Sequence, residues 1–179
     1  MVGRSTRRAA YDEAVPFEID PTMHPDLAPL AWMLGRWEGA GVVGYPTIES
    51  ANFGQEVEAT HDGRPFIFWS SRTWRLDAQG EPTAPLATET GFWRPLPDGE
   101  VELVLAHATG IVEMYYGSTS PAKVEVRTDG VLRSPRAAEY AAAHRLYGYV
   151  NGGLMWAMDM AAVGQPLTSH VSAELKRVG

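Results

Sequence analysis

The chain has 179 residues, of which 45% are hydrophobic, and it carries 15 basic and 22 acidic side chains for a formal net charge of −7. This length predicts one folded domain with a sizeable core, and the negative charge disfavours binding to nucleic acid or to acidic membrane surfaces. No run approaches the ~20 apolar residues of a membrane-spanning helix. Because the chain has no cysteine, disulfides and thiolate chemistry are excluded, any redox chemistry needs a bound cofactor, and a cytoplasmic location is the default expectation.

The N-terminal residues 1–23 are expected to form a flexible leader. Arginines and carboxylates mix there without the apolar core of a signal peptide. The folded domain is expected to span residues 24–179. It begins with apolar residues at helical spacing between Pro25 and Leu34, which predict a short helix that caps or plugs the fold.

From Gly35 onward the sequence has the rhythm of an antiparallel meander, in which turn signals separate β-rich runs. The turn signals are Asp62-Gly63, Gln79-Gly80, Pro97-Asp98-Gly99, Thr109-Gly110, Asp129-Gly130, Asn151-Gly152-Gly153 and Gly164-Gln165-Pro166. Residues 137–144 suit either a helix or a strand. About ten short strands predict an all-β fold, a ten-stranded antiparallel up-and-down barrel with a short N-terminal helix. Such a barrel encloses a pocket unless bulky residues, such as the six tryptophans, fill it.

The first expected strand carries glycines at every second position, in Gly35-x-Trp37-x-Gly39-x-Gly41. One face of this strand is therefore bare. A bare face suits the close approach of another strand or of a flat cofactor.

Five histidines stand at positions 24, 61, 107, 144 and 170, and none forms the spaced pair of a dedicated zinc site. His61 begins an expected turn and His24 lies beside prolines before the expected helix, and both positions favour an ordinary solvated role. His107 ends the apolar run 101–106 and is a candidate for the barrel mouth. Strict alternation places His170 on the solvent face of its strand, unless a bulge after Pro166 or a position at the barrel rim turns it inward. No catalytic dyad, nucleophile elbow or phosphate loop is found.

Five segments taken together resemble the nitrobindin family, over about residues 24–178. They are residues 35–41, Tyr45-Pro46-Thr47-Ile48, residues 90–95, residues 101–110 and the closing Pro166-Leu167-x-x-His170. The resemblance implies a barrel of the lipocalin and fatty-acid-binding-protein shape that holds one ferric haem b per chain. It also implies that His170 is the proximal axial ligand, and so the metal-binding and catalytic residue.

The activity implied by this resemblance is that of a peroxynitrite isomerase, which converts peroxynitrite to nitrate, together with reversible binding of nitric oxide. The expected partners are thus small molecules, with a homodimer as a further family-based expectation. The haem contacts that the resemblance implies are Gly35, Trp37, Gly39, Gly41, Thr47, Leu86, Ala87, His107, Met160 and His170.

Two positions depart from the family pattern. Ala138 stands where many relatives carry a lysine, so a cationic contact to a haem propionate is lost unless Arg136 replaces it. Ala87 stands where some relatives carry a second pocket histidine, which implies a drier cavity with fewer hydrogen-bond donors on the side away from His170.

The main alternative is a haem-free barrel that carries a fatty acid or another small apolar ligand. Such a carrier needs one or two interior cations to hold a carboxylate, and Arg72, Arg94 and Arg145 are the candidates. A purely structural or interaction domain is a third alternative. It would be favoured if the barrel contained no pocket.

Overall fold

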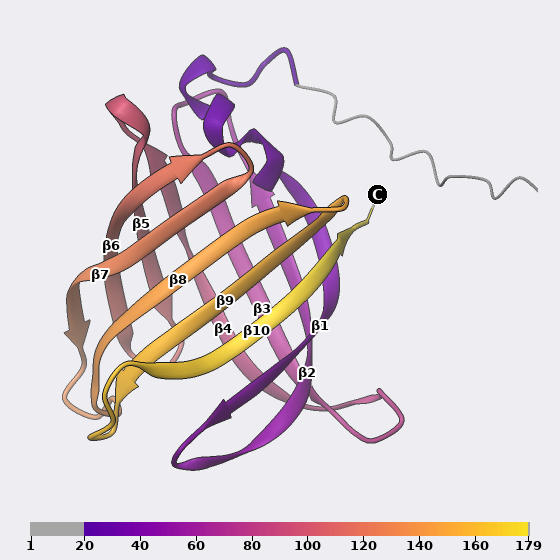
Figure 1. The fold of residues 1–179 in the computed structure, drawn as a ribbon, viewed down its shortest axis with the longest axis vertical. Helices are drawn as coiled ribbons and strands as arrows, with labels where there is room; N and C mark the ends of the chain where they lie inside the picture. The colour runs from indigo at the N-terminus through magenta and orange to yellow at the C-terminus, as the bar shows by residue number, and fades with distance from the viewer. Residues whose placement is uncertain (1–19, 179) are drawn as a thin grey trace, which may run out of the picture.

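The computed structural model describes residues 20–178 and shows a closed barrel of ten antiparallel strands (Figure 1). The strands are β1 (Gly35–Tyr45), β2 (Ile48–Thr60), β3 (Ile67–Leu76), β4 (Pro82–Pro95), β5 (Glu100–His107), β6 (Ile111–Ser120), β7 (Lys123–Arg133), β8 (Tyr140–Val150), β9 (Gly153–Ala162) and β10 (Thr168–Arg177). Each strand pairs with its neighbours along the chain, and β10 pairs with β1 to close the ring. The predicted fold class is confirmed.

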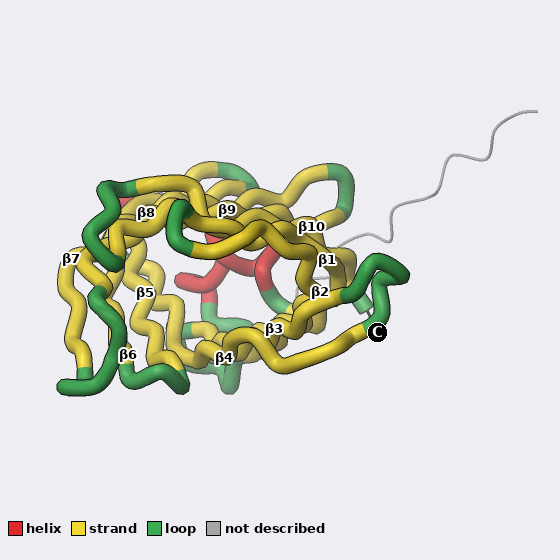
Figure 2. Tube along the Cα trace, turned by 90° about the horizontal axis from the view of Figure 1, so that it is seen from below, coloured by secondary structure: helices red, strands yellow, loops and turns green. Residues whose placement is uncertain are grey.

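One end of the barrel is plugged by the predicted short helix, η1 (Pro25–Met33), which is a 3₁₀ helix. His24 caps it, since its Nδ1 accepts a hydrogen bond from the Asp26 amide. Proline within the helix removes a backbone donor, which suits a short tight helix better than a long regular one. Leu27, Leu30 and Met33 are fully buried. Figure 2 looks into the barrel from below and shows the helix behind the ring of strands.

Aromatic side chains fill the interior on the side of η1. The rings of Trp69, Trp93 and Tyr147 lie edge to face with centroids 5.2–6.0 Å apart, and Tyr147 stacks on Trp156. Trp37 donates its indole N–H to the Met33 carbonyl at 2.8 Å and so connects β1 to the plug. The tryptophans therefore fill the interior only in part.

Two local expectations need correction or completion. Asp129-Gly130 is not a turn, because both residues lie inside β7, where the register with β6 shifts. The turn between β6 and β7 lies instead at residues 121–122, where Ala122 takes a φ of 57°. The ambiguous segment becomes strand from Tyr140 onward, because pairing with β9 overrides its helix propensity.

Residues 1–19 of the expected leader lie outside the described residues. Its last residues, 20–23, form a turn in which the Thr22 amide donates to the Asp20 carboxylate, and Asp20 pairs with His61 at 3.4 Å. Within residues 20–178, no helix is long and apolar enough to cross a membrane.

Candidate functional site

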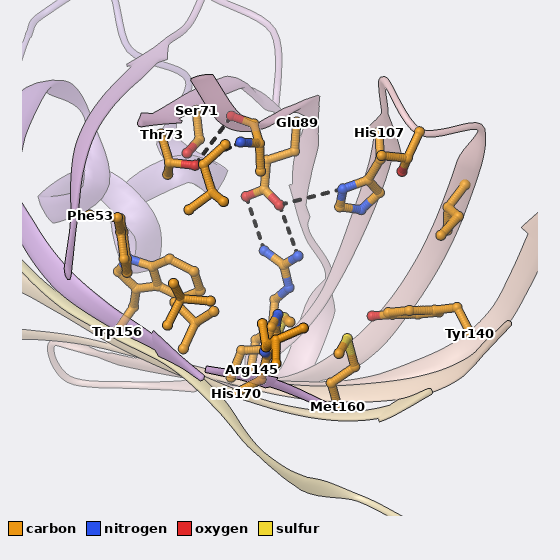
Figure 3. Close-up of a pocket in the computed structure, with 18 residues that line it drawn as sticks. Phe53, Ser71, Thr73, Glu89, His107, Tyr140, Arg145, Trp156, Met160 and His170 are labelled. Carbon is orange, nitrogen blue, oxygen red and sulfur yellow. Dashed lines mark hydrogen bonds and ion pairs between the residues drawn. The ribbon is translucent and has the colours of Figure 1, made fainter. Parts of the chain in front are cut away.

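A cavity of about 360 Å³ lies inside the barrel, at the end opposite η1 (Figure 3). Small-molecule sites typically have volumes of roughly 300–1,000 Å³. The apolar lining residues are Val43, Ile48, Phe53, Leu86, Ala87, Ile111, Trp156, Met158, Met160 and Val171. The polar ones are Ser71, Thr73, Glu89, His107, Thr109, Tyr140, Arg145 and His170. A pocket of this kind disfavours a purely structural role.

A bulge in β10 turns His170 toward this cavity. Pairing with β9 runs from Ser169 opposite Asp159 directly to Val171 opposite Met158, so His170 is the extra residue. Both His170 and Val171 line the cavity as a result. In a regular strand, two consecutive side chains would point to opposite faces. The bulge after Pro166, one of the two conditions under which the sequence predicts an inward His170, is therefore present.

The His170 ring is held by its outer nitrogen. Nδ1 lies 2.9 Å from the Gly44 carbonyl oxygen, and because a carbonyl only accepts, Nδ1 carries the hydrogen and donates it. The ring of Tyr45 packs edge-on against the imidazole at 5.3 Å. In the neutral ring Nε2 is then left with a free lone pair, the arrangement typical of a metal-binding histidine.

Burial favours the neutral form of this histidine. Loss of solvent lowers the pKa of His170, the Gly44 hydrogen bond opposes that change in part, and the charge of Arg145 adds to it. Tyr45 fixes the neighbouring backbone, since its hydroxyl donates to the Met160 carbonyl at 2.9 Å and accepts the Ala162 N–H at 3.0 Å. The result is a neutral and oriented imidazole at the cavity wall.

A buried ion pair lines another part of the cavity. The Arg145 guanidinium, 2% exposed, donates two hydrogen bonds to the Glu89 carboxylate, at 3.0 and 2.8 Å. Burial alone would raise the pKa of Glu89, but the charge and hydrogen bonds of Arg145 outweigh it and keep the pKa low. Glu89 is therefore ionised at neutral pH.

A second carboxylate, Glu113, is fully buried behind the cavity wall. It lies 2.7 Å from Nε2 of His107 and accepts hydrogen bonds from the hydroxyls of Tyr115 and Tyr140, at 2.6 and 2.5 Å. Burial acts to raise the pKa of Glu113, whereas His107, Arg145 and the two tyrosines lower it, and the net pKa is below its ordinary value. This carboxylate is also ionised at neutral pH.

Of the predicted haem contacts, Leu86, Ala87, His107, Met160 and His170 line the cavity. The others lie elsewhere: Gly35, Trp37, Gly39, Gly41 and Thr47 are not among the lining residues. Thr47 is exposed in the turn between β1 and β2. Trp37 is fully buried beside η1.

Strand packing accounts for the glycines at positions 39 and 41. A Cβ on Gly39 would lie 2.1 Å from the Glu174 carbonyl oxygen, and one on Gly41 would lie 2.2 Å from that of Ser172. Both oxygens belong to β10. The bare face of β1 thus allows the close approach of the strand that closes the barrel.

Arg145, Glu89 and Glu113 form a charged cluster inside the barrel. The sequence did not reveal this cluster, although Arg145 was a candidate to hold the carboxylate of a fatty acid. A signal for it exists in the phase of the strands. Glu113 shares the inward phase of Ile111 and Tyr115, and Arg145 shares that of Tyr147. A charged residue on the buried phase of a strand requires a partner inside.

The interior cation required by a fatty-acid carrier is already neutralised. Arg145 is paired with Glu89 and lies 3.8 Å from Glu113. Arg72 and Arg94 pair with Glu56 and Glu102 and are more than half exposed. Arg136, the proposed replacement for the missing lysine, is exposed in the loop before β8.

Comparison with known proteins gives consistent matches. The family model for a THAP4-like, heme-binding beta-barrel domain matches residues 26–177. A "Peroxynitrite isomerase" of Nocardioides sp. is 50% identical over 163 residues, which cover 91% of this chain and 99% of that protein. A "Ferric nitrobindin-like protein" of Kineococcus radiotolerans is 46% identical over 180 residues, 92% of this chain and 99% of that protein. The crystal structure of Rv2717c from M. tuberculosis matches with a TM-score of 0.79 at 36% identity and covers 88% of this chain and 99% of that one.

Proposed function

Because the chain belongs to the family of THAP4-like, heme-binding beta-barrel domains, we propose that it holds one haem b in the cavity and isomerises peroxynitrite to nitrate. The relatives named ferric nitrobindin-like protein bear out the resemblance to nitrobindins. The observation that carries the proposal is the inward turn of His170, whose Nδ1 donates to Gly44 and leaves Nε2 free for iron. His170 is thus the proposed axial ligand and metal-binding residue.

The residues present fit this group. A neutral imidazole in a cavity with largely apolar walls is the donor set of a single-histidine haem site. Among the described residues, no cluster of histidine, aspartate and glutamate forms an alternative metal site. Leu86, Ala87, His107 and Met160 are the proposed haem contacts.

The five predicted contacts outside the cavity have an indirect role in this proposal. Gly39 and Gly41 let β1 and β10 approach each other, which positions His170 on β10. Trp37 connects the opposite end of β1 to η1 through its hydrogen bond to Met33, and Gly35 begins that strand with a φ of 119°. Thr47 lies next to Ile48, which lines the cavity mouth.

When bound, ferric haem supplies a Lewis-acidic iron with one coordination position open to an anion or to nitric oxide. The protein's own residues hold and confine the reactants. Gly44 and Tyr45 orient His170, and burial keeps its ring unprotonated. The largely apolar wall would exclude water and confine a bound reactant.

The proposed activity is tested by stopped-flow decay of peroxynitrite with analysis of the products. Hemin-loaded protein is expected to accelerate the decay in proportion to its concentration and to raise the yield of nitrate over nitrite. Apo-protein and hemin-treated His170→Ala serve as controls. A decay rate and nitrate yield equal to those of apo-protein would contradict the proposal.

Nitric oxide binding at the ferric iron is the second part of the same proposal. Nitric oxide is expected to shift the Soret band of the hemin-loaded protein, and removal of the gas is expected to reverse the shift.

In this proposal the protein acts in the cytoplasm, consistent with a chain that has no cysteine. A homodimer stays a prediction from the family resemblance.

A further inference from the structure

The outer face of the barrel carries a hollow of about 630 Å³ along strands β8, β9 and β10. Figure 1 shows these three strands side by side across the front of the barrel. Small outward residues leave this space, among them Ala157, Ser172 and Gly148. Met155, which is 41% exposed, lies in the same hollow. An exposed apolar surface of this kind is typical of a site that binds a partner.

Bulky and small residues alternate on β8 and β9 in complementary order. The outward residues that lie opposite each other on these strands are Leu146 with Ala157, Gly148 with Met155, and Val150 with Gly153. The bulky member is on β8 in the first pair, on β9 in the second and on β8 again in the third. A twofold axis along the strands, between β8 and β9, would place β8 of one copy over β9 of another. Each bulky side chain would then enter the space above a small residue of the second copy.

Opposite charges flank the central pair of this surface. Glu174 on β10 lies beside Met155, and Lys123 on β7 lies beside Gly148. The same axis would bring Glu174 of each copy against Lys123 of the other, so the ion pair would form twice. Glu174 is exposed and forms no ion pair within residues 20–178. Lys123 lies 3.2 Å from Glu125 but its side chain is half exposed, so it can meet a second carboxylate.

The other charged residues in these rows meet no like charge under the axis. In the next row, Asp159 would face His144 of the second copy. The remaining pairs that the register implies are Glu125 with Ser172, Arg127 with Ser169, and Lys176 with the uncharged turn at residues 121–122. Like charges across an interface would oppose docking, and this arrangement avoids them.

A second exposed apolar row, on β3 to β6, lacks these properties. Its neighbouring residues are Phe68, Phe92, Val104 and Met114. Large side chains follow one another there, and the rings of Phe68 and Phe92 already pack together with centroids 5.3 Å apart. The charged residues beside the row, Arg94 and Glu102, form an ion pair with each other at 2.6 Å. This row therefore has no complementary match to itself.

We propose that the outer face of β8 and β9 docks a second copy of this chain in a twofold dimer, with β8 of each copy over β9 of the other. Sheets that pack face to face keep their strands within about 30° of each other, which an axis along the strands satisfies. The inference does not depend on the proposed haem function. It assigns a surface to the homodimer, which the sequence predicted only from the family resemblance.

Sedimentation velocity of the purified full-length chain over a range of concentrations measures the dimer dissociation constant. Met155→Glu is expected to raise this constant by roughly tenfold or more, because it places a carboxylate in the apolar centre of the interface. Met114→Glu on β6 is the matched control, since Met114 is 40% exposed and Met155 is 41% exposed. The control is expected to leave the constant unchanged. Melting temperatures show whether each variant is folded.

Charge reversal tests the proposed axis itself. Glu174→Lys and Lys123→Glu are each expected to raise the dissociation constant by roughly tenfold or more, because each creates two like-charged pairs across the interface. An equal mixture of these two variants should recover the dimer, since every lysine at these positions then faces a glutamate. Native mass spectrometry identifies the mixed dimer by its mass. A change confined to one copy would not be relieved by mixing.

Three results would overturn the inference, and none of them bears on hemin binding. A wild type that stays monomeric at every concentration would show that no second copy docks on this face. A dimer that survives Met155→Glu would place the interface elsewhere, and its loss in Met114→Glu would place it on the row of Phe92. Weakening by both charge reversals without recovery in the mixture would contradict the twofold arrangement.

Discussion

Arg145 and Glu89 form an ion pair that stabilises the barrel only while both partners are present. Taking two charges out of water is costly, and the cost is offset here by two direct hydrogen bonds, by the Trp69 indole N–H that donates to Glu89, and by tyrosine hydroxyls that accept from Arg145. The pair lies on the cavity wall, and Arg145 also compensates the second buried carboxylate at Glu113. Removal of the arginine would leave two uncompensated negative charges inside the barrel.

We therefore expect Arg145→Met to lower the free energy of unfolding by about 3–5 kcal/mol at neutral pH. The matched control is Arg72→Met, because Arg72 pairs with Glu56 on the outer surface and is 64% exposed. That change is expected to cost about 0–1 kcal/mol. Urea unfolding followed by tryptophan fluorescence measures both values.

The same pair predicts a pH dependence. The pKa values of Glu89 and Glu113 are lowered by folding, so their contribution is present above the ordinary carboxyl pKa of about 4.5 and is lost as the pH falls through the lower folded values. In Arg145→Met the two carboxylates lack their cation, and protonation relieves the repulsion. The difference in the free energy of unfolding between wild type and Arg145→Met should therefore become smaller toward pH 4. A deficit that is constant with pH would contradict this explanation.

At the scale of elements, the glycines of β1 belong to barrel closure. We expect Gly39→Ala to lower the free energy of unfolding by at least about 1–3 kcal/mol, because the new Cβ would overlap the backbone of β10. Gly130→Ala in β7 is the control, since a Cβ added there would meet nothing within 4 Å and the φ of this glycine is not positive. That change is expected to be neutral or to stabilise by up to about 1 kcal/mol.

Equal effects of the two alanine substitutions would show that close strand packing is not the reason for glycine at position 39. Hemin binding by any folded Gly39→Ala protein is a second readout. Retained hemin affinity in that variant would support the indirect role of β1, and a selective loss without destabilisation would favour direct contact with the cofactor.

The elements show which features local sequence can predict. Ten strands and a plugging helix were predictable, because apolar periodicity and turn residues act within one hairpin. The turn at Ala122 was not, since alanine carries no turn signal and takes its positive φ from the pairing of β6 with β7. The sequence named a bulge only as one condition under which His170 would face inward. It could not predict the bulge itself, because the bulge arises from the register between β10 and β9.

At the scale of the whole molecule, the residues that pack the core and the residues that line the cavity lie toward opposite ends of the barrel. The plug and the aromatic rings fill one end, and the cavity occupies the other. Closure between β1 and β10 brings Gly44 to His170, although the two are 126 residues apart in the chain. The charged cluster likewise draws on strands β4, β6 and β8. Such contacts depend on the complete ring, which explains why the family resemblance could suggest His170 as a ligand whereas the sequence did not reveal the partners that hold its ring.

The central claim is that His170 binds haem iron through Nε2 inside this cavity. Titration of the purified protein with hemin, followed at the Soret band and by melting temperature, tests it most directly, with His170→Ala in parallel. His144→Ala is the control, because His144 pairs with Glu125 and Asp159 and does not line the cavity. Wild type and His144→Ala are expected to show a Soret change that saturates at one hemin per chain. With hemin at about 100 times its dissociation constant, each should gain about 2.7 kcal/mol in the free energy of unfolding. In His170→Ala the saturating Soret change and the rise in melting temperature should both be lost. A weak, non-saturating spectral change that is the same in all three proteins would contradict the account.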